Sequence, residues 1–192
     1  MNPLIDTFPT ALRVGDAVYP IHSDFRMAIT ILLAFEDPNL TACERMAILY
    51  DLLYEQKPPD IIEGCRKAVL FLDCGEECPK KEDDSGSQML RLYSLRRDAP
   101  YLYAAFREAY GIDLEREDMH WWKFCYLFGD LPESCMFHQL VTLRRRRAMG
   151  RLTPEEQRLW YEMEEILELP QPMDAQKAQA EYEFNRDRKS VV

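Results

Sequence analysis

Glycine is scarce in this chain, and long apolar runs are absent. Only 7 of the 192 residues are glycine, whereas leucine, alanine, glutamate, arginine and methionine are plentiful. These residues favour helices, because their side chains lose little freedom there, whereas glycine loses a great deal of backbone freedom. Charged residues interrupt every apolar run within a few positions, which argues against a membrane-spanning helix. We therefore expect a mainly α-helical protein with no membrane partner.

An excess of positive charge is also missing. The chain has 24 lysine and arginine residues against 34 aspartate and glutamate residues, a net charge of −10. Nonspecific binding to nucleic acid or to anionic lipid requires a basic face that neutralises phosphates. Nucleic acid is therefore an unfavoured partner. The first ten residues have no basic region followed by an apolar core, so we expect no secretory signal.

Motifs for catalysis and for cofactor binding are absent too. His22, His120 and His138 are isolated, no H-E-x-x-H pattern occurs, and the glycines are too scattered for a phosphate-binding loop. His120 precedes two tryptophans, so we expect a hydrogen-bonded core histidine rather than a catalytic base. We predict no catalytic residue, no cofactor and no enzymatic activity.

The six cysteines are expected to be reduced and to pack as small apolar side chains. Cys74 and Cys78 form a C-x3-C pair, but a structural zinc site would need two more ligands. Cys65 could supply one, yet it lies on an apolar helix face with no histidine near it in sequence. We predict no metal site, and a disulfide between Cys74 and Cys78 in an oxidised sample is the better alternative.

Local signals divide the chain into a small hairpin and about seven helices. Gly15-Asp16 is typical of a two-residue hairpin turn. Thr41 with Glu44, and Thr153 with Glu156, have the spacing of capping boxes. Asp98, followed by Pro100 in the first turn, is expected to cap its helix. The predicted elements are strands 11–14 and 17–21 and helices 24–35, 41–55, 60–72, 98–110, 116–128, 133–149 and 153–168.

These elements are predicted to form one compact helical bundle. The segment DCGEECPKKEDDSGSQ has little to bury, so we expect a solvated acidic loop between two halves of the domain. The predicted organisation is an N-terminal extension 1–9, a single domain 10–168 with halves 10–72 and 89–168, a loop 73–88 and a polar tail 169–192. Apolar spacing predicts the inner faces of helices 60–72 and 153–168, namely Ile61, Cys65, Ala68, Val69 and Leu72, and Leu159, Met163, Ile166 and Leu167.

Two segments stand out from the rest. Tyr110 to Phe128 combines a helix stop, a short acidic connection and the most aromatic run in the chain, and we expect the aromatic run to be a central core helix. The basic run comprises Arg144, Arg145, Arg146 and Arg147 and closes a helix, where cations complement the helix dipole. We expect the stem of Arg144 to face inwards and the run to form an exposed or partner-binding basic patch, with nucleic acid as the minor alternative.

Several segments resemble one known family in their spelling and order. They are Asp24-Phe25-Arg26, Asp98, Tyr101 to Phe106 (YLYAAF), Tyr110 to Leu114 (YGIDL), His120 to Phe124 (HWWKF), Leu131-Pro132 and Thr142-Leu143-Arg144. Over residues 10–168 the sequence resembles the phage family known as gene product fifteen. We expect its motif residues to form structural core: Tyr110, Gly111, Asp113, His120, Trp121, Trp122 and Phe124.

The resemblance implies a role in the assembly of phage tails. Related proteins are interpreted as tail assembly chaperones that keep the tape measure protein soluble and help to recruit the major tail protein. The implied location is the host bacterial cytoplasm, and we expect the protein to be absent from the mature virion. A structural tail or connector component is the main alternative, and a nucleic-acid-binding regulator or small enzyme is less favoured. A homo-oligomer is left open.

Overall fold

The computed structural model of the chain describes residues 2–76 and 91–169. Most of the predicted acidic loop and nearly all of the predicted polar tail therefore lie outside the described residues. The mainly α-helical fold with a small N-terminal hairpin is confirmed. The elements are β1 (Ala11–Val14), β2 (Ala17–Pro20), α1 (Phe25–Glu36), α2 (Ala42–Leu53), α3 (Ile61–Leu72), α4 (Ala99–Tyr110), α5 (Trp121–Gly129), α6 (Met136–Ala148), α7 (Pro154–Glu162) and α8 (Glu164–Leu167).

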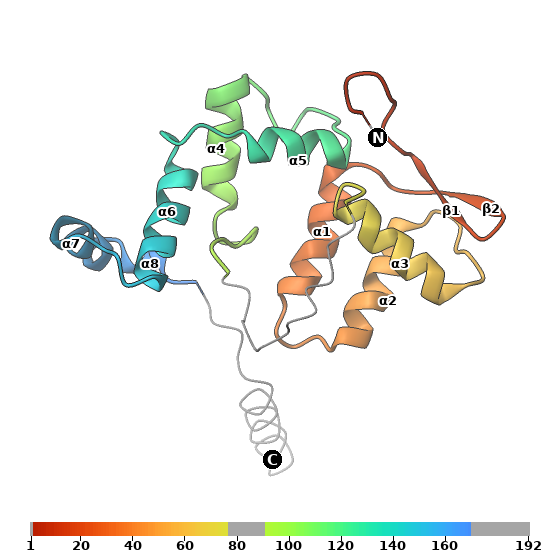
Figure 1. The fold of residues 1–192 in the computed structure, drawn as a ribbon, viewed down its shortest axis with the longest axis horizontal. Coiled ribbons are helices and arrows are strands. Elements are labelled where there is room, and N and C mark those ends of the chain that lie inside the picture. The colour runs from red at the N-terminus through yellow and green to blue at the C-terminus, as the bar shows by residue number, and fades with distance from the viewer. Residues whose placement is uncertain (1, 77–90, 170–192) are drawn as a thin grey trace, which may run out of the picture.

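The elements are arranged on two sides that α5 connects. Figure 1 shows the hairpin and α1–α3 on one side, and α4 with α6–α8 on the other. The strands pair antiparallel, with Ala11 opposite Pro20 and Val14 opposite Ala17. The helix α5 runs between the sides and contacts α1. In the ranges that the structure describes, no helix combines the length and the apolar character that crossing a bilayer requires.

The predicted caps explain where several helices begin and end. Thr41 with Glu44, and Thr153 with Glu156, form reciprocal capping boxes at α2 and α7. Gly111 ends α4 in the left-handed conformation, at a φ of 69°, which costs a glycine little. One cap prediction is wrong, because the Asp98 side chain makes no capping bond to α4. Its carboxylate bonds Arg144 instead.

The aromatic helix α5 begins at Trp121, five residues later than predicted. The backbone just before it is used to pair with the start of α1. The amide of Phe25 donates to the carbonyl oxygen of Met119, and the amide of Trp121 donates to that of Ser23. Because these backbone groups bond across to another segment, residues before Trp121 cannot complete a helical turn.

The predicted inner face of α3 is partly wrong. Ile61 and Val69 are exposed, whereas Gly64, Ala68 and Phe71 are buried. A Cβ atom at Gly64 would lie 2.9 Å from the Tyr50 ring, which is too close for any other residue without a shift. The glycine therefore lets α3 approach α2 on that face, and the apolar residues on either side of it turn outwards.

The predicted last helix is divided in two, and its buried face also differs. The helical run breaks at Met163, where α7 ends and α8 begins. Trp160 and Leu167 are buried, while Leu159 and Ile166 are exposed. Trp160, which the apolar pattern had not singled out, is the main apolar anchor of this part of the chain.

The core draws side chains from both sides of the molecule. Its main cluster includes Phe25 of α1, Phe71 of α3, Phe106 of α4 and Phe124 of α5. A smaller cluster, Leu140, Leu143, Trp160 and Leu167, holds α6, α7 and α8 together. The aromatic helix α5 thus contributes to a core that includes side chains from both sides. The helices α6, α7 and α8 have a separate apolar cluster.

Candidate partner-binding surface

The ring of His120 is fully occupied by backbone contacts. Its Nδ1 accepts a hydrogen bond from the amide of Trp122 at 3.0 Å. Its Nε2 lies 3.0 Å from the carbonyl oxygen of Pro9 and therefore carries the proton that it donates there. Burial lowers the pKa of His120, which keeps the ring neutral. This histidine caps α5 and fixes the N-terminal segment, and neither nitrogen is left for chemistry.

The two tryptophans of α5 anchor that helix to the end of α3. The indole N–H of Trp121 donates to the carbonyl oxygen of Leu72 at 2.9 Å. That of Trp122 donates to Phe71 at 2.8 Å. Phe124 stacks between two further rings, with centroids 5.0 Å from Phe25 and 4.9 Å from Phe106. The Trp121 indole thus satisfies a carbonyl near the C-terminus of α3. The Phe71 carbonyl accepts from the amide of Cys74 as well as from Trp122.

The remaining motif residues shape the turn that precedes α5. The hydroxyl of Tyr110 donates to the carbonyl oxygen of Leu127 at 2.8 Å. Asp113 accepts hydrogen bonds from the hydroxyl of Tyr103 and from Arg107, both at 2.8 Å. The bond from Tyr103 is the main reason why the pKa of Asp113 is lowered. The structure places the seven motif residues in and around α4 and α5, where they make structural contacts.

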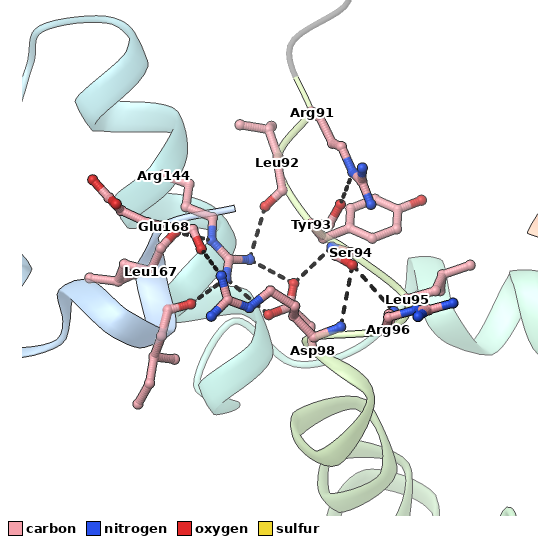
Figure 2. A network of polar contacts seen from close by, with 12 residues as sticks. Arg91, Leu92, Tyr93, Ser94, Leu95, Arg96, Asp98, Arg144, Leu167 and Glu168 are labelled. Atoms are coloured by element: carbon pink, nitrogen blue, oxygen red, sulfur yellow. Dashed lines mark hydrogen bonds and ion pairs between the residues drawn. The ribbon is translucent and has the colours of Figure 1, made fainter. Parts of the chain in front are cut away.

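The predicted basic patch is wrong at Arg144, which is buried. All five N–H groups of its guanidinium are used: two bond the Asp98 carboxylate, at 2.7 and 2.9 Å, and three bond the carbonyl oxygens of Leu92, Ile166 and Leu167. Figure 2 shows this network, in which Asp98 also accepts from the amide of Ser94. The sequence predicted that the aliphatic stem of Arg144 faces inwards. In the structure the charged guanidinium is buried as well.

The other three arginines of the run are exposed. Arg146 forms an ion pair with Glu156 of α7. The guanidinium of Arg147 lies 4.3 Å from the centroid of the Trp160 ring, a cation–π contact. The basic patch is therefore made of Arg145, Arg146 and Arg147, and two of its members also position α7.

A groove of about 360 Å³ lies beside this patch. Arg147 and Trp160 contribute to its wall. Its apolar lining also includes Leu92, Ala148, Leu167 and Leu169. Apolar side chains are exposed on the neighbouring helices, with Tyr161 at 71%, Leu159 at 39% and Ile166 at 36% of their full accessible surface. We call this groove, with its exposed apolar neighbours and Arg145 to Arg147, the α6–α8 surface.

Sequence reasoning missed Trp160 as the centre of this surface. A usable signal was present, because Trp160, Met163 and Leu167 follow the i, i+3, i+7 spacing of a helix face. Among the described residues there is no group of three or more histidine, cysteine, aspartate or glutamate side chains that could hold a metal ion. Cys78 lies outside the described residues.

Comparison with known proteins locates the chain in a family. No curated protein and no solved structure matches it. The family model described as "Bacteriophage Gp15 protein" matches residues 4–169, which include the aromatic motif, the buried Arg144 and the whole of the α6–α8 surface up to Leu169. The chain therefore belongs to the bacteriophage Gp15 protein family.

Proposed function

We propose that this bacteriophage protein is a tail assembly chaperone that binds helical segments of the tape measure protein and helps to bring in the major tail protein. The observation that supports it best is the α6–α8 surface, which combines a groove of mixed apolar and charged lining with Leu159 and Tyr161 exposed on α7. Contiguous exposed apolar groups commonly mark protein-binding sites. The role needs no catalytic residue, and it belongs to the host cytoplasm rather than to the finished particle.

The chemistry of the surface suits an amphipathic helix. The apolar face of such a helix can bury side chains against Trp160, Leu159 and Tyr161. Acidic residues that flank this face can pair with Arg145 and Arg147. The net charge of −10 would keep a complex with an apolar client in solution.

The test is co-expression of the chain with the tape measure protein of the same phage. The wild type is expected to keep that client soluble and to co-purify with it. The double variant Leu159→Ser, Tyr161→Ser should reduce co-purification at least about tenfold, because the lost apolar contacts are worth more than about 1.4 kcal/mol. Both side chains are exposed, so the fold should persist.

The matched control is Ile62→Ser on α3, where the isoleucine is 85% exposed on the other side of the molecule. It should leave co-purification unchanged. If Ile62→Ser lost co-purification and the double variant did not, the binding surface would lie on α3 instead. An insoluble client with no complex would contradict the chaperone role. Mass spectrometry of purified virions supplies a further check, since abundant protein in mature particles would favour a structural tail or connector component.

A further inference from the structure

Two cysteines meet where α3 ends against α5. Cys74 follows the last turn of α3, and Cys125 lies on α5 one turn beyond Trp121. The hydrogen bonds from Trp121 and Trp122 to the carbonyls of Leu72 and Phe71 hold these two segments together. Residues three and four apart share a helix face, so Cys125 lies on the side of α5 that faces the end of α3.

The backbone at Cys74 is held in an unusual conformation. Its φ is 56°, and among the described residues it is the one non-glycine residue in the left-handed region. The following Gly75 is packed so closely that a Cβ there would lie 3.0 Å from the Trp122 ring. The chain therefore turns sharply at Cys74 and packs against α5 at Gly75.

The two thiols affect each other's acidity. A hydrogen bond between them lowers the pKa of the Cys74 thiol and raises the pKa of the Cys125 thiol. Both residues are partly exposed, so a small oxidant can reach them, whereas Cys135 is buried. Cys65 differs in that burial raises the pKa of its thiol. Cys74 is thus the better nucleophile of the pair, with its partner already beside it.

We propose that Cys74 and Cys125 are a redox modification site, at which a peroxide oxidises the pair to a disulfide between the end of α3 and α5. The Cys74 thiolate attacks one peroxide oxygen, the O–O bond breaks, and the released hydroxide is protonated to water. The resulting sulfenic acid is attacked by the sulfur of Cys125, which loses its proton while the hydroxyl group leaves as a second water. Two thiols and one hydrogen peroxide give one disulfide and two waters.

This pairing competes with the disulfide between Cys74 and Cys78 that the sequence pattern suggested. A bridge to Cys78 would close a loop of only a few residues and would constrain the fold little. A bridge to Cys125 closes about 50 residues and joins the end of α3 to the connecting helix α5. The two outcomes therefore differ both in connectivity and in their effect on stability.

The experiment treats the full chain with hydrogen peroxide, blocks the remaining thiols with N-ethylmaleimide and identifies linked peptides by mass spectrometry. We expect a peptide that joins Cys74 to Cys125, with loss of two of the six thiols. The melting temperature of the oxidised protein should be about 5–10 °C above that of the reduced protein. Cys78→Ser should keep both results, whereas Cys74→Ser and Cys125→Ser should each abolish them.

Three results would overturn the proposal. One is a peptide that joins Cys74 to Cys78 in place of the expected one. Another is a cross-link that disappears in Cys78→Ser. The third is oxidation of Cys74 to sulfinic acid with no cross-link in a wild-type protein whose circular dichroism shows it to be folded.

Discussion

At the scale of single residues, Arg144 is a buried charged group that stabilises the fold through an ion pair and several hydrogen bonds. Its guanidinium and the Asp98 carboxylate are both buried, and each makes further hydrogen bonds to the backbone. Removing one partner of such a pair leaves the other charge buried and unpaired, which costs more than the pair itself contributes. Arg144, which the sequence placed in a partner-binding patch, therefore stabilises the folded state.

We expect Arg144→Met to lower the free energy of unfolding by about 3–5 kcal/mol, because Asp98 is left uncompensated. Urea denaturation measures this loss. The control is Arg145→Met in the same run, whose exposed side chain should change stability by less than about 0.5 kcal/mol. A double variant, Asp98→Asn with Arg144→Met, should lose less than the sum of the single changes. Equal effects of the two arginine variants would contradict the role of Arg144.

Trp121→Ala should cost about 3–5 kcal/mol, because it removes a large buried ring and leaves the carbonyl of Leu72 without its donor. Thermal unfolding followed by circular dichroism measures the change. Tyr161→Ala, at an exposed aromatic residue, should cost less than about 0.5 kcal/mol. A Trp121→Ala protein of normal stability that no longer binds its client would show instead that α5 belongs to the binding surface.

At the scale of elements, α7 depends strongly on its N-terminal capping box. Glu156 accepts a hydrogen bond from the amide of Thr153, and this bond is the main reason why the pKa of Glu156 lies below its ordinary value of 4.5. Arg146 of α6 adds to the same effect. The end of α6 and the start of α7 are therefore coupled through one carboxylate.

A lowered pKa in the folded state makes the stability of α7 depend on acidity. The contribution of Glu156 is fully present above its ordinary pKa of 4.5 and is lost as the pH falls through its lowered folded pKa. We expect faster hydrogen exchange of the α7 amides, corrected for intrinsic rates, below about pH 4 than at pH 6. Glu156→Gln should show less of this dependence. Exchange in α7 that is independent of pH in the wild type would contradict the coupling.

At the scale of the whole molecule, Glu36 joins the two sides. It lies at the end of α1, and its carboxylate accepts hydrogen bonds from the hydroxyl of Ser94 and the amide of Leu95, both at 2.9 Å. Arg91 pairs with the same carboxylate. Ser94 in turn donates its amide to Asp98. A continuous polar chain therefore runs from α1 through the start of α4 to Arg144 and α8.

Glu36→Ala should lower the free energy of unfolding by about 2–3 kcal/mol, because it leaves partly buried donors at Ser94 and Leu95 without an acceptor. In the wild type we expect one unfolding transition, seen alike by tryptophan fluorescence and by circular dichroism. If Glu36 couples the two sides, the variant should show different unfolding midpoints by fluorescence and by circular dichroism. Glu108→Ala, at an exposed position of α4, serves as the control. Coincident signals and unchanged stability in Glu36→Ala would contradict the coupling.

The sequence by itself determined the fold class, most helices and the family. These follow from local signals, such as the capping boxes at Thr41 and Thr153 and the glycine that ends α4, which act over a few residues and need no distant partner. The spelling of the segments around Trp121 and Trp122 was likewise enough to indicate the Gp15 family. The site residues were located less well than the fold.

The tertiary structure decided which faces are buried and which charges are free. Apolar spacing could not reveal that Gly64 allows α3 to pack closely against α2, or that Trp160 rather than Leu159 is buried. Nor could it reveal that the Asp98 side chain bonds Arg144 instead of capping α4. The contact between Gly64 and Tyr50 spans 14 residues of the chain, and the pair of Asp98 with Arg144 spans 46. A helix pattern specifies that one face is covered, but the packing of distant segments specifies which face it is, and with it the surface left for a partner.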